Sequence, residues 1–282
     1  MELKPYMVIS LQAAIAAGAA INEVYRSEDF NVEYKTDESP LTIADRKSHD
    51  IIVGALKNYD LPILSEEGQS MPYAQRKKWD RFWLVDPLDG TKEFIKRNGE
   101  FTVNIALIEN RRPILGTIFV PDRQTLYFAA HDFGAYKLQD GPFNELQSAV
   151  TDSDQHARNL LNQIVAQSTR LPGQDDRRTA LTIVGSRSHK TPELEAYVAE
   201  KRKAFGDVDF ISAGSSLKIC LVAEGKADIY PRLGPTMEWD TAAGQAIAEA
   251  AGATVCAYDT AKPLTYNKED LHNPWFIVQR ET

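Results

Sequence analysis

Two carboxylates lie three residues apart at the end of an apolar, strand-like run. The run covers residues 82–85, and it is followed by Asp86, Pro87, Leu88, Asp89, Gly90 and Thr91. Pro87 fixes one backbone torsion and Gly90 tolerates conformations that a β-carbon would forbid, so we expect both acids to project from a tight turn at a sheet edge. Mg²⁺ takes oxygen ligands and keeps several waters, so a few well-placed carboxylates suffice to bind it. The pattern therefore predicts a Mg²⁺ site that handles a phosphate group.

Acidic residues also end or begin two other expected elements. Glu66 and Glu67 follow a strand-like run at 62–65, and Asp240 stands at the start of an apolar helical stretch. By itself Asp240 has an ordinary interpretation as the N-cap of that helix, because Asp is a favoured cap. Glu67 is expected to cap or to support its neighbour, whereas Glu66 is the expected ligand. The combination of three such segments favours one shared metal site.

Charge and composition restrict the classes of partner. The 282 residues are 43% apolar and 26% charged, which is typical of a soluble globular protein, and no run is expected to be long enough to cross a membrane. The net charge of −8 argues against a general binder of nucleic acid or of anionic membranes, because either needs a basic face. A small anionic substrate remains compatible with this charge if metal ions and a few local cations face it.

The N-terminal segment and the cysteines bear on location. Residues 7–21 are Ala-rich and apolar like the core of a signal peptide, but their apolar positions recur at helical spacing beside a polar face, and Glu2 offsets Lys4. Cys220 and Cys256 lie in apolar stretches and are interpreted as reduced core thiols. We therefore expect a cytoplasmic protein, and the sequence leaves open a peripheral association with the inner membrane face.

The elements that must position these residues form two series. In the first, helices at 7–25 and 42–56 precede a meander of strands at 101–108, 114–120, 126–129 and 134–138. The second alternates strands at 181–184, 208–211, 227–230, 254–257 and 276–279 with helices at 191–204, 216–224 and 241–251. Residues 139–179 are irregular around one expected helix at 156–167, and we interpret them as an insertion or loose connection. This segment divides the chain into a 1–180 half and a 181–282 half.

The three acidic motifs, in this order, resemble the lithium-sensitive, Mg²⁺-dependent phosphatases of the inositol monophosphatase superfamily. Residues 83–108 and 214–225 are similar to its 3′(2′),5′-bisphosphate nucleotidase branch, and Lys92, Glu93 and Phe94 stand where inositol monophosphatases more often have Thr, Asn and Phe. Residues 139–179 exceed the length that we expect for the family. The resemblance implies an α/β (α+β) fold of the layered αβαβα sugar-phosphatase type.

The resemblance also implies a set of metal ligands for two or three Mg²⁺ ions. They are the side chains of Glu66, Asp86, Asp89 and Asp240 and the carbonyl oxygen of Leu88. Asp86 would bridge two ions, and Asp240 would bind the second. Clustered acids repel one another without a cation, so we expect an inactive and more mobile site in chelator.

For catalysis the resemblance implies that Thr91 and Asp45 orient the attacking water at a centre that includes Glu66. The alternative for Asp45 is structural, because the segment from Thr42 to Asp45 fits a capping box. The backbone N–H groups of Gly90 and Thr91, at the start of a helix, would hold phosphate oxygens.

Further substrate contacts are implied on the C-terminal side of the chain. The substrate-binding candidates there, beside the Glu66, Leu88, Asp89, Gly90, Thr91 and Asp240 site, are Ser186, Ser215, Ser216, Lys218 and Arg232. Lys218 and Arg232 are preferred for a phosphate that does not react, since Lys and Arg pair well with that anion. For each residue alone, a solvated surface charge or a helix cap is an equally good interpretation.

The resemblance implies hydrolysis of the 3′-phosphate of adenosine 3′,5′-bisphosphate to AMP, and also action on its sulfated form. This would clear the by-product of sulfate activation, with inhibition by Li⁺ in place of one Mg²⁺. The nearest alternative is a phosphatase for inositol or another sugar monophosphate. A non-catalytic phosphate-binding regulator would require a lost ligand, and none of the expected ligands is missing. The sequence leaves open a monomer or a homodimer.

Overall fold

The computed structural model describes residues 3–27, 33–34, 40–149, 153–173, 180–187 and 191–280. The sequence also predicts an extended piece at 31–34, a turn at Ser39 and Pro40, and polar residues near the substrate at Ser188 and His189. Residues 31–32, Ser39, Ser188 and His189 lie outside these ranges, as do 152 and 174–178 of the irregular segment.

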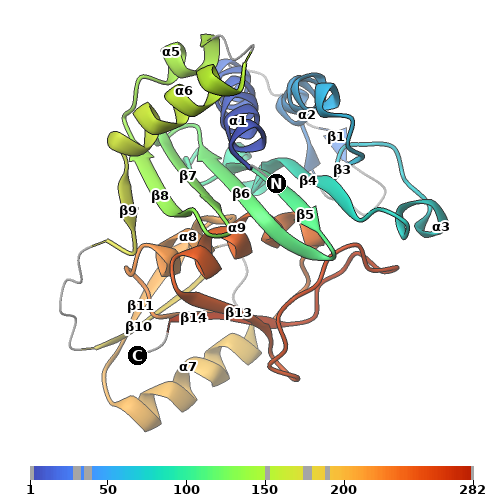
Figure 1. Ribbon diagram of the computed structural model, residues 1–282. Helices are drawn as coiled ribbons and strands as arrows, with labels where there is room; N and C mark the ends of the chain where they lie inside the picture. The colour runs from blue at the N-terminus through green and yellow to red at the C-terminus, as the bar shows by residue number, and fades with distance from the viewer. Residues whose placement is uncertain are drawn as a thin grey trace.

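A seven-stranded sheet organises the N-terminal half (Figure 1). Its strands follow one another in chain order, and all neighbours are antiparallel except β3 and β4, which run parallel. The strands are β3 (Ile63–Ser65), β4 (Arg81–Asp89), β5 (Thr102–Glu109), β6 (Arg112–Val120), β7 (Thr125–Ala130), β8 (Gly134–Gln139) and β9 (Thr169–Leu171). Most of their residues are buried on both faces, which requires a layer of helices on each side.

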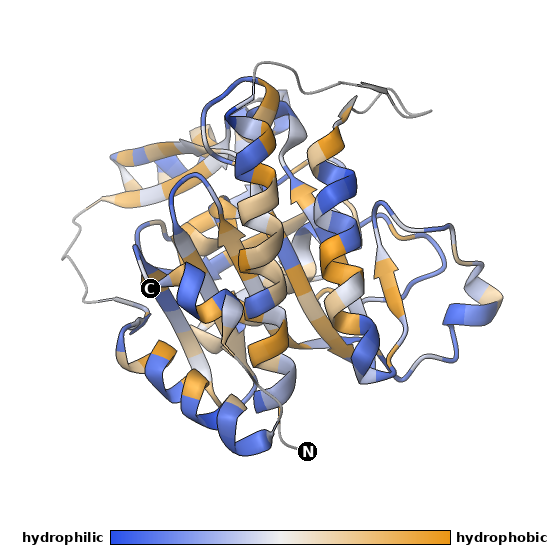
Figure 2. Cartoon of the chain, turned by 90° about the horizontal axis from the view of Figure 1, so that it is seen from above, coloured by the Kyte–Doolittle hydropathy of each residue, from blue (hydrophilic) through white to orange (hydrophobic). Residues whose placement is uncertain are grey.

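One face of this sheet is covered by the helices of the N-terminal half. They are α1 (Lys4–Tyr25), α2 (Ile43–Leu56), α5 (Phe143–Ser148) and α6 (Asp154–Ala166). Figure 2 shows apolar residues along the strands and along the helices that lie over them. Short elements complete this half: β1 (Glu33–Tyr34), β2 (Pro40–Leu41), the 3₁₀ helix η1 (Lys57–Tyr59), α3 (Tyr73–Arg76) and α4 (Thr91–Ile95).

The first helix corrects one expectation. By length and hydropathy α1 could span a membrane, although we expected no segment of that kind. Here it is a core helix: Met7, Leu11, Ala14 and Ile21 are at most 1% exposed and pack in the same cluster as residues of β5 and β6. The helical spacing expected for 7–25 is confirmed, and the helix begins three residues earlier.

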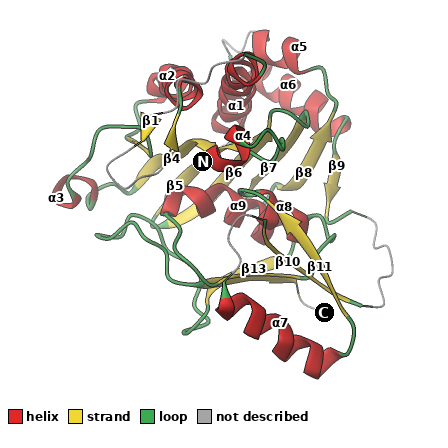
Figure 3. Ribbon diagram, turned by 180° about the vertical axis from the view of Figure 1, so that it is seen from behind, coloured by secondary structure: helices red, strands yellow, loops and turns green. Residues whose placement is uncertain are grey.

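A five-stranded sheet organises the C-terminal half, in the order β11-β10-β12-β14-β13. Its strands are β10 (Leu181–Ser186), β11 (Val208–Ala213), β12 (Ile229–Arg232), β13 (Ala253–Ala257) and β14 (Phe276–Arg280). Two helices, α8 (Leu217–Ala223) and α9 (Glu238–Ala250), lie between the two sheets, and α7 (Pro192–Phe205) lies on the outer side of the second sheet (Figure 3). The order of layers is therefore helix, sheet, helix, sheet, helix, as expected.

The described residues of the segment at 139–179, namely 139–149 and 153–173, do not form a loose connection. The expected helix at 156–167 is present as α6, but α5 and β9 accompany it, and β9 pairs with β8 as the seventh strand of the first sheet. Phe143, Leu161 and Ile164 are buried against α1 in the N-terminal core. Apolar residues that were scattered in the sequence therefore complete this core.

Candidate active site

A local irregularity in β4 places the first two acids. The strand runs from Arg81 through Asp89, beyond the expected end at residue 85, and its pairing with β5 shifts register between Asp86 and Asp89. Such a bulge inserts extra residues and redirects side chains. Asp86 is 1% exposed, and its Oδ1 accepts a hydrogen bond of 3.0 Å from the Leu88 N–H. The bulge brings both carboxylates and the Leu88 carbonyl to one end of the strand.

The acid from the second half comes from the first turn of α9. This helix begins at Glu238, so Asp240 is its third residue, and the alternative interpretation of Asp240 as the N-cap is wrong. The Asp240 Oδ2 nonetheless accepts a hydrogen bond of 2.9 Å from the N–H of Met237, which is the N-cap. The carboxylate thus satisfies a free N–H at the helix start, and this bond fixes its orientation.

Ser216 joins the two groups of acids. Its hydroxyl oxygen lies 2.8 Å from Asp89 Oδ2 and 2.9 Å from the Asp240 carbonyl oxygen, and it accepts a hydrogen bond from the Asn104 amide. The structure therefore brings together two acids that are 151 positions apart in the sequence.

Burial and mutual repulsion disfavour the ionised forms of these acids when no cation is bound. Burial, then the charges of Glu66, Asp89 and Asp240, raises the pKa of Asp86 well above its usual range. Burial and the charge of Asp89 do the same for the pKa of Asp240. A cation at the site would stabilise the charged forms that the protein alone disfavours.

The donor set fits Mg²⁺ in chemistry. All candidate ligands are oxygens, and the backbone N–H of Glu66 is held 3.1 Å from the Val85 carbonyl oxygen, beside the acids of β4. Within the described ranges, no three acidic, His or Cys side chains converge into a preformed cage. Mg²⁺ retains much of its water and is commonly bound through one or two carboxylates plus substrate phosphate, so it does not need such a cage.

Asp45 serves two elements at once. Its Oδ2 accepts hydrogen bonds from the N–H (2.8 Å) and hydroxyl (2.6 Å) of Thr42, the capping box of α2, while its Oδ1 lies 3.4 Å from the Thr91 hydroxyl. The expected cap and the expected contact with Thr91 are therefore both present. Burial raises the pKa of Asp45 to about 6, so this carboxylate can accept a proton near neutral pH.

Two cationic side chains lie at the same site as the acids. Lys218 is 5% exposed, and its Nζ donates a hydrogen bond of 2.6 Å to the Ser215 carbonyl oxygen. Burial lowers the pKa of Lys218 to about 8, with Asp89 opposing this shift and Arg232 adding to it. Arg232 is close enough to repel Lys218, and its Nε has no hydrogen-bond partner in the described parts of the chain. Lys218 is therefore not a solvated surface charge, whereas Arg232 is half-buried and its Nη2 donates a hydrogen bond of 2.7 Å to the Pro235 carbonyl oxygen.

An open cavity of ≈ 220 Å³ connects the acids with these cations. It is lined by most of the residues expected at the site, namely Glu66, Asp89, Gly90, Thr91, Ser186, Ser215, Ser216, Lys218, Arg232 and Asp240. Asp45, Asp86 and Leu88 are not among its lining residues; they lie behind the lining and reach it through the contacts given above. The cavity therefore combines carboxylates with two cationic side chains, and Asp89 lies close enough to Lys218 to oppose the lowering of its pKa.

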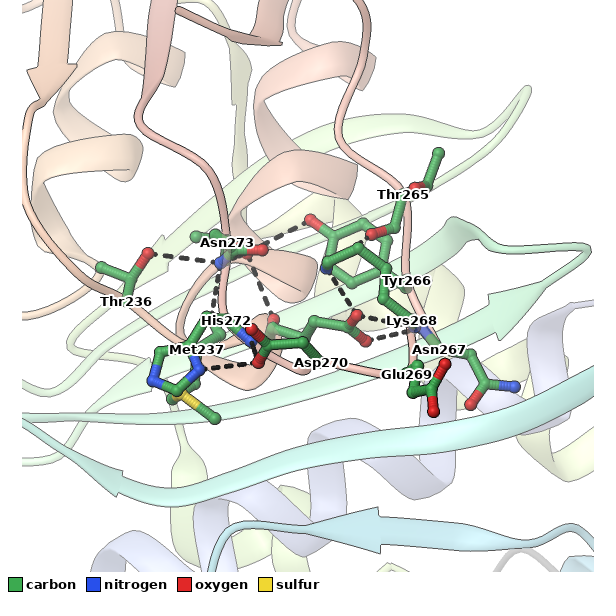
Figure 4. Close-up of polar contacts among 12 residues, drawn as sticks. Thr236, Met237, Thr265, Tyr266, Asn267, Lys268, Glu269, Asp270, His272 and Asn273 are labelled. Atoms are coloured by element: carbon green, nitrogen blue, oxygen red, sulfur yellow. Dashed lines mark hydrogen bonds and ion pairs between the residues drawn. The ribbon is translucent and has the colours of Figure 1, made fainter. Parts of the chain in front are cut away.

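A second network supports the start of α9 (Figure 4). Glu238 is fully buried and accepts hydrogen bonds from the backbone N–H groups of Asn267 (2.6 Å) and Lys268 (2.9 Å) and from the Lys268 Nζ. The Asn273 amide donates to the Met237 carbonyl oxygen at 2.6 Å. The loop at 265–273 thus holds the turn that carries Asp240.

The sequence reasoning missed three residues that shape this site. Asn104 positions Ser216, Tyr230 lines the cavity, and Glu100 binds the turn that contains Ser215. Asn104 and Tyr230 were expected only as members of strands, and neither was given a role in the site. Glu100 belongs to no motif, and its partners come from distant segments, so no local pattern could have found it.

Comparison with known proteins agrees with this architecture. Residues 2–276 match the model of the inositol monophosphatase family. A protein of Escherichia coli strain K12 named 3′(2′),5′-bisphosphate nucleotidase CysQ is 44% identical over 271 residues, covering 95% of this chain and 96% of that protein. The crystal structure of CysQ from Bacteroides thetaiotaomicron superposes with a TM-score of 0.87 at 50% identity, covering 100% of this chain and 99% of that one.

A more distant structure shares the fold alone. An inositol monophosphatase of Thermotoga maritima has a TM-score of 0.68 at 21% identity and covers 96% of this chain and 90% of that chain. The family match over nearly the whole length, with the acids, the Thr91–Asp45 pair and the two sheets in place, identifies the chain as a member of the inositol monophosphatase family.

Proposed function

We propose that the protein is a Mg²⁺-dependent 3′(2′),5′-bisphosphate nucleotidase that hydrolyses the 3′-phosphate of adenosine 3′,5′-bisphosphate to AMP and phosphate. The names of its relatives support the activity. The single observation that supports a bisphosphate as the substrate is that Lys218 and Arg232 line the same cavity as the acids. A bisphosphate would place one phosphate at the acids and offer the second to Lys218 and Arg232, whereas a monophosphate has no second anion for these two cations.

Glu66, Asp86, Asp89, Asp240 and the Leu88 carbonyl would hold the metal, as two or three Mg²⁺ ions. When bound, Mg²⁺ supplies Lewis-acid stabilisation of phosphate oxygens and lowers the pKa of water. The protein's own part is to hold these oxygens in place through the Ser216 hydroxyl and the turn before α9.

Thr91 and Asp45 would orient the attacking water. The Thr91 hydroxyl donates toward Asp45 Oδ1, which leaves an oxygen lone pair of Thr91 directed away from that carboxylate to accept a water proton. Because the pKa of Asp45 is about 6, it is mostly ionised at pH 7 and can take the proton that Thr91 passes on.

A phosphate-release panel tests this function. Adenosine 3′,5′-bisphosphate, its sulfated form and inositol 1-phosphate are each assayed with Mg²⁺, with Mg²⁺ plus Li⁺, and with chelator. We expect fastest release from the bisphosphate, loss of activity in chelator and inhibition by Li⁺. Faster turnover of inositol 1-phosphate would support the alternative, an inositol or other sugar monophosphatase.

We further infer a cytoplasmic enzyme of sulfur metabolism, acting on a small-molecule nucleotide, with 1–180 and 181–282 as its two halves. The burial of α1 and the two free cysteines support the location. Peripheral membrane association and the choice between monomer and homodimer remain predictions, to be tested by cell fractionation and by light scattering.

A further inference from the structure

Glu100 is a buried carboxylate with an unusually complete set of donors. Arg187 binds it through two nitrogens, Nε to Oε2 at 2.8 Å and Nη2 to Oε1 at 2.9 Å. Arg123 donates to Oε1 at 2.8 Å, and the Gly214 N–H donates to Oε2 at 2.8 Å. The side chain is 6% exposed, whereas those of Arg123 and Arg187 are 47% and 46% exposed. The Glu100 carboxylate is therefore held in a fixed position inside the protein, and the two arginines lie between it and the solvent.

These contacts hold one particular turn. The Glu100 backbone carbonyl accepts a hydrogen bond of 2.7 Å from the Ser215 hydroxyl, next to the Gly214 contact with the side chain. Ser215 has a φ of 38°, which a non-glycine residue adopts only when its surroundings enforce it. The Ser215 carbonyl in turn accepts the hydrogen bond from Lys218. Glu100 thus fixes the backbone that orients this lysine.

The turn packs closely against its neighbours. A β-carbon at Gly214 would lie 2.6 Å from the Glu93 Cγ and 2.9 Å from the Glu100 Cβ, and one at Gly90 would lie 3.0 Å from the Ser215 Cβ. The turn is therefore pressed between Glu100 and the Gly90–Thr91 segment of the reaction site. Glu100 itself is not among the residues that line the cavity.

We propose that Glu100 is a positioning residue for recognition of the phosphate that does not react. By holding the Gly214–Ser215 turn, Glu100 fixes the position of Lys218 in the cavity. This inference rests on the proposed function. It deepens that function by assigning preference for a bisphosphate over a 3′-monophosphate to a residue that does not touch substrate.

The test compares two substrates that differ only in the 5′-phosphate, adenosine 3′,5′-bisphosphate and adenosine 3′-monophosphate. The readout is the ratio of their kcat/KM values on one enzyme preparation, which cancels any loss of folded enzyme. We expect Glu100→Gln to lower this ratio about tenfold, mainly through a higher KM for the bisphosphate, since a charge-assisted hydrogen bond is lost from the turn. An unchanged ratio would overturn the proposal.

Glu224→Gln is the matched control. Glu224 is equally buried, at 7% exposed, and binds Tyr127, Lys137 and Lys226 at the far end of α8, the helix that carries Lys218. We expect a comparable loss of stability with a selectivity ratio within about twofold of wild type. An equal fall of the ratio in both variants would show that general destabilisation is responsible and would overturn the proposal.

A second variant keeps the test decisive if Glu100→Gln does not fold. Arg187→Gln removes two of the donors from a half-exposed position and should lower the ratio in the same direction by about threefold. Wild-type enzyme that fails to prefer the bisphosphate would contradict the proposed function instead. The two failures are therefore distinguishable.

Discussion

Carboxylates that share a small site repel one another, and Asp86, Asp89 and Asp240 do so with only Lys218 as a close buried cation among the described residues. Each is held by a neutral donor: the Leu88 N–H, the Ser216 hydroxyl and the Met237 N–H. Neutral donors orient a carboxylate without cancelling its charge. The residues are therefore arranged for a cation that the protein does not itself supply.

Replacing Asp89 with Asn should separate catalysis from stability. We expect Asp89→Asn to lower phosphate release more than about 100-fold, because a ligand is lost. In chelator, the same variant should unfold at a temperature equal to or above that of wild type, since one repelling charge is removed. Assays at saturating Mg²⁺ and calorimetry in chelator measure the two effects. Undiminished turnover would contradict the assignment of Asp89 as a ligand.

The sequence predicted the place of single residues where a local pattern marks the end of an element, and their roles as ligands or catalytic groups remain predictions. The acids of residues 86–89, Glu66 and Thr91 stand at element ends that a strand or helix pattern reveals. Glu100 could not be predicted, because its importance comes from Arg123, Arg187 and Gly214, which approach it only in three dimensions. Burial of Lys218 was missed for the same reason.

At the scale of elements, α9 approaches the first sheet closely. A β-carbon at Gly116 in β6 would lie 2.3 Å from the Ala243 carbonyl oxygen of α9. The glycine thus permits helix and strand to touch backbone to backbone, with Asp240 one turn away on the same helix. The distance between α9 and β6 therefore determines how far Asp240 lies from the acids of β4.

The glycine contact predicts an asymmetric effect of two alanine substitutions. Gly116→Ala should lower the free energy of unfolding by about 2–3 kcal/mol through overpacking and should reduce activity by displacing α9. Gly54→Ala in α2, where no heavy atom lies within 4 Å of the added carbon, should instead be neutral or stabilise by about 0.5–1 kcal/mol. Urea unfolding of both variants checks this; equal effects would rule out the close approach.

Glu224 predicts a pH dependence of the link between α8 and strands β7 and β8. Burial alone would raise the pKa of Glu224, but hydrogen bonds from Lys226, Tyr127 and Lys137 outweigh it and lower the pKa below 4.5. A lowered folded-state pKa contributes stability above the unfolded value, and this contribution is lost as the pH falls through the folded value.

Glu224→Gln should therefore destabilise the protein by about 2 kcal/mol at pH 7. The difference from wild type should shrink as the pH falls from 5 toward and below the folded-state pKa. Denaturant unfolding along this pH series is the measurement. A difference that grows toward acid would reverse the assigned direction.

Element boundaries were less predictable than element types. Most of the expected helices and strands exist, but β4 continues through the acids because β5 pairs with it beyond the bulge, and α9 starts before Asp240 because Met237 and Glu238 are bound by the 265–273 loop. Strand β9 was missed because its three residues gain their partners only from β8. In each case the boundary or the strand depends on contacts with distant segments, which a local sequence pattern does not contain.

For the whole molecule, the proposed metal site takes its residues from both halves of the chain. Glu66, Asp86 and Asp89 belong to the first sheet and its loops, and Asp240 belongs to a helix between the sheets. A cation bound by both parts stabilises only the assembled structure, so binding is coupled to folding.

Unfolding should accordingly depend on Mg²⁺. The melting temperature of wild type should rise with Mg²⁺ concentration, by an amount that corresponds to about 2.7 kcal/mol at 100 times the dissociation constant. In Asp240→Asn the rise should be much smaller, because the ligand from the C-terminal half is lost. Calorimetry over a series of Mg²⁺ concentrations measures the rise in melting temperature. Ca²⁺-free KCl at equal ionic strength is the control. An equal rise in both proteins would contradict the role of Asp240.

The bridge made by the Ser216 hydroxyl has a consequence for biogenesis. A ribosome releases Asp86 and Asp89 long before Ser216 and Asp240, so the growing polypeptide carries a crowded group of like charges whose remaining members have not yet been synthesised. Catalytic competence is acquired only when the final third of the chain docks. We therefore expect a product truncated before Ser216 to have no hydrolytic activity.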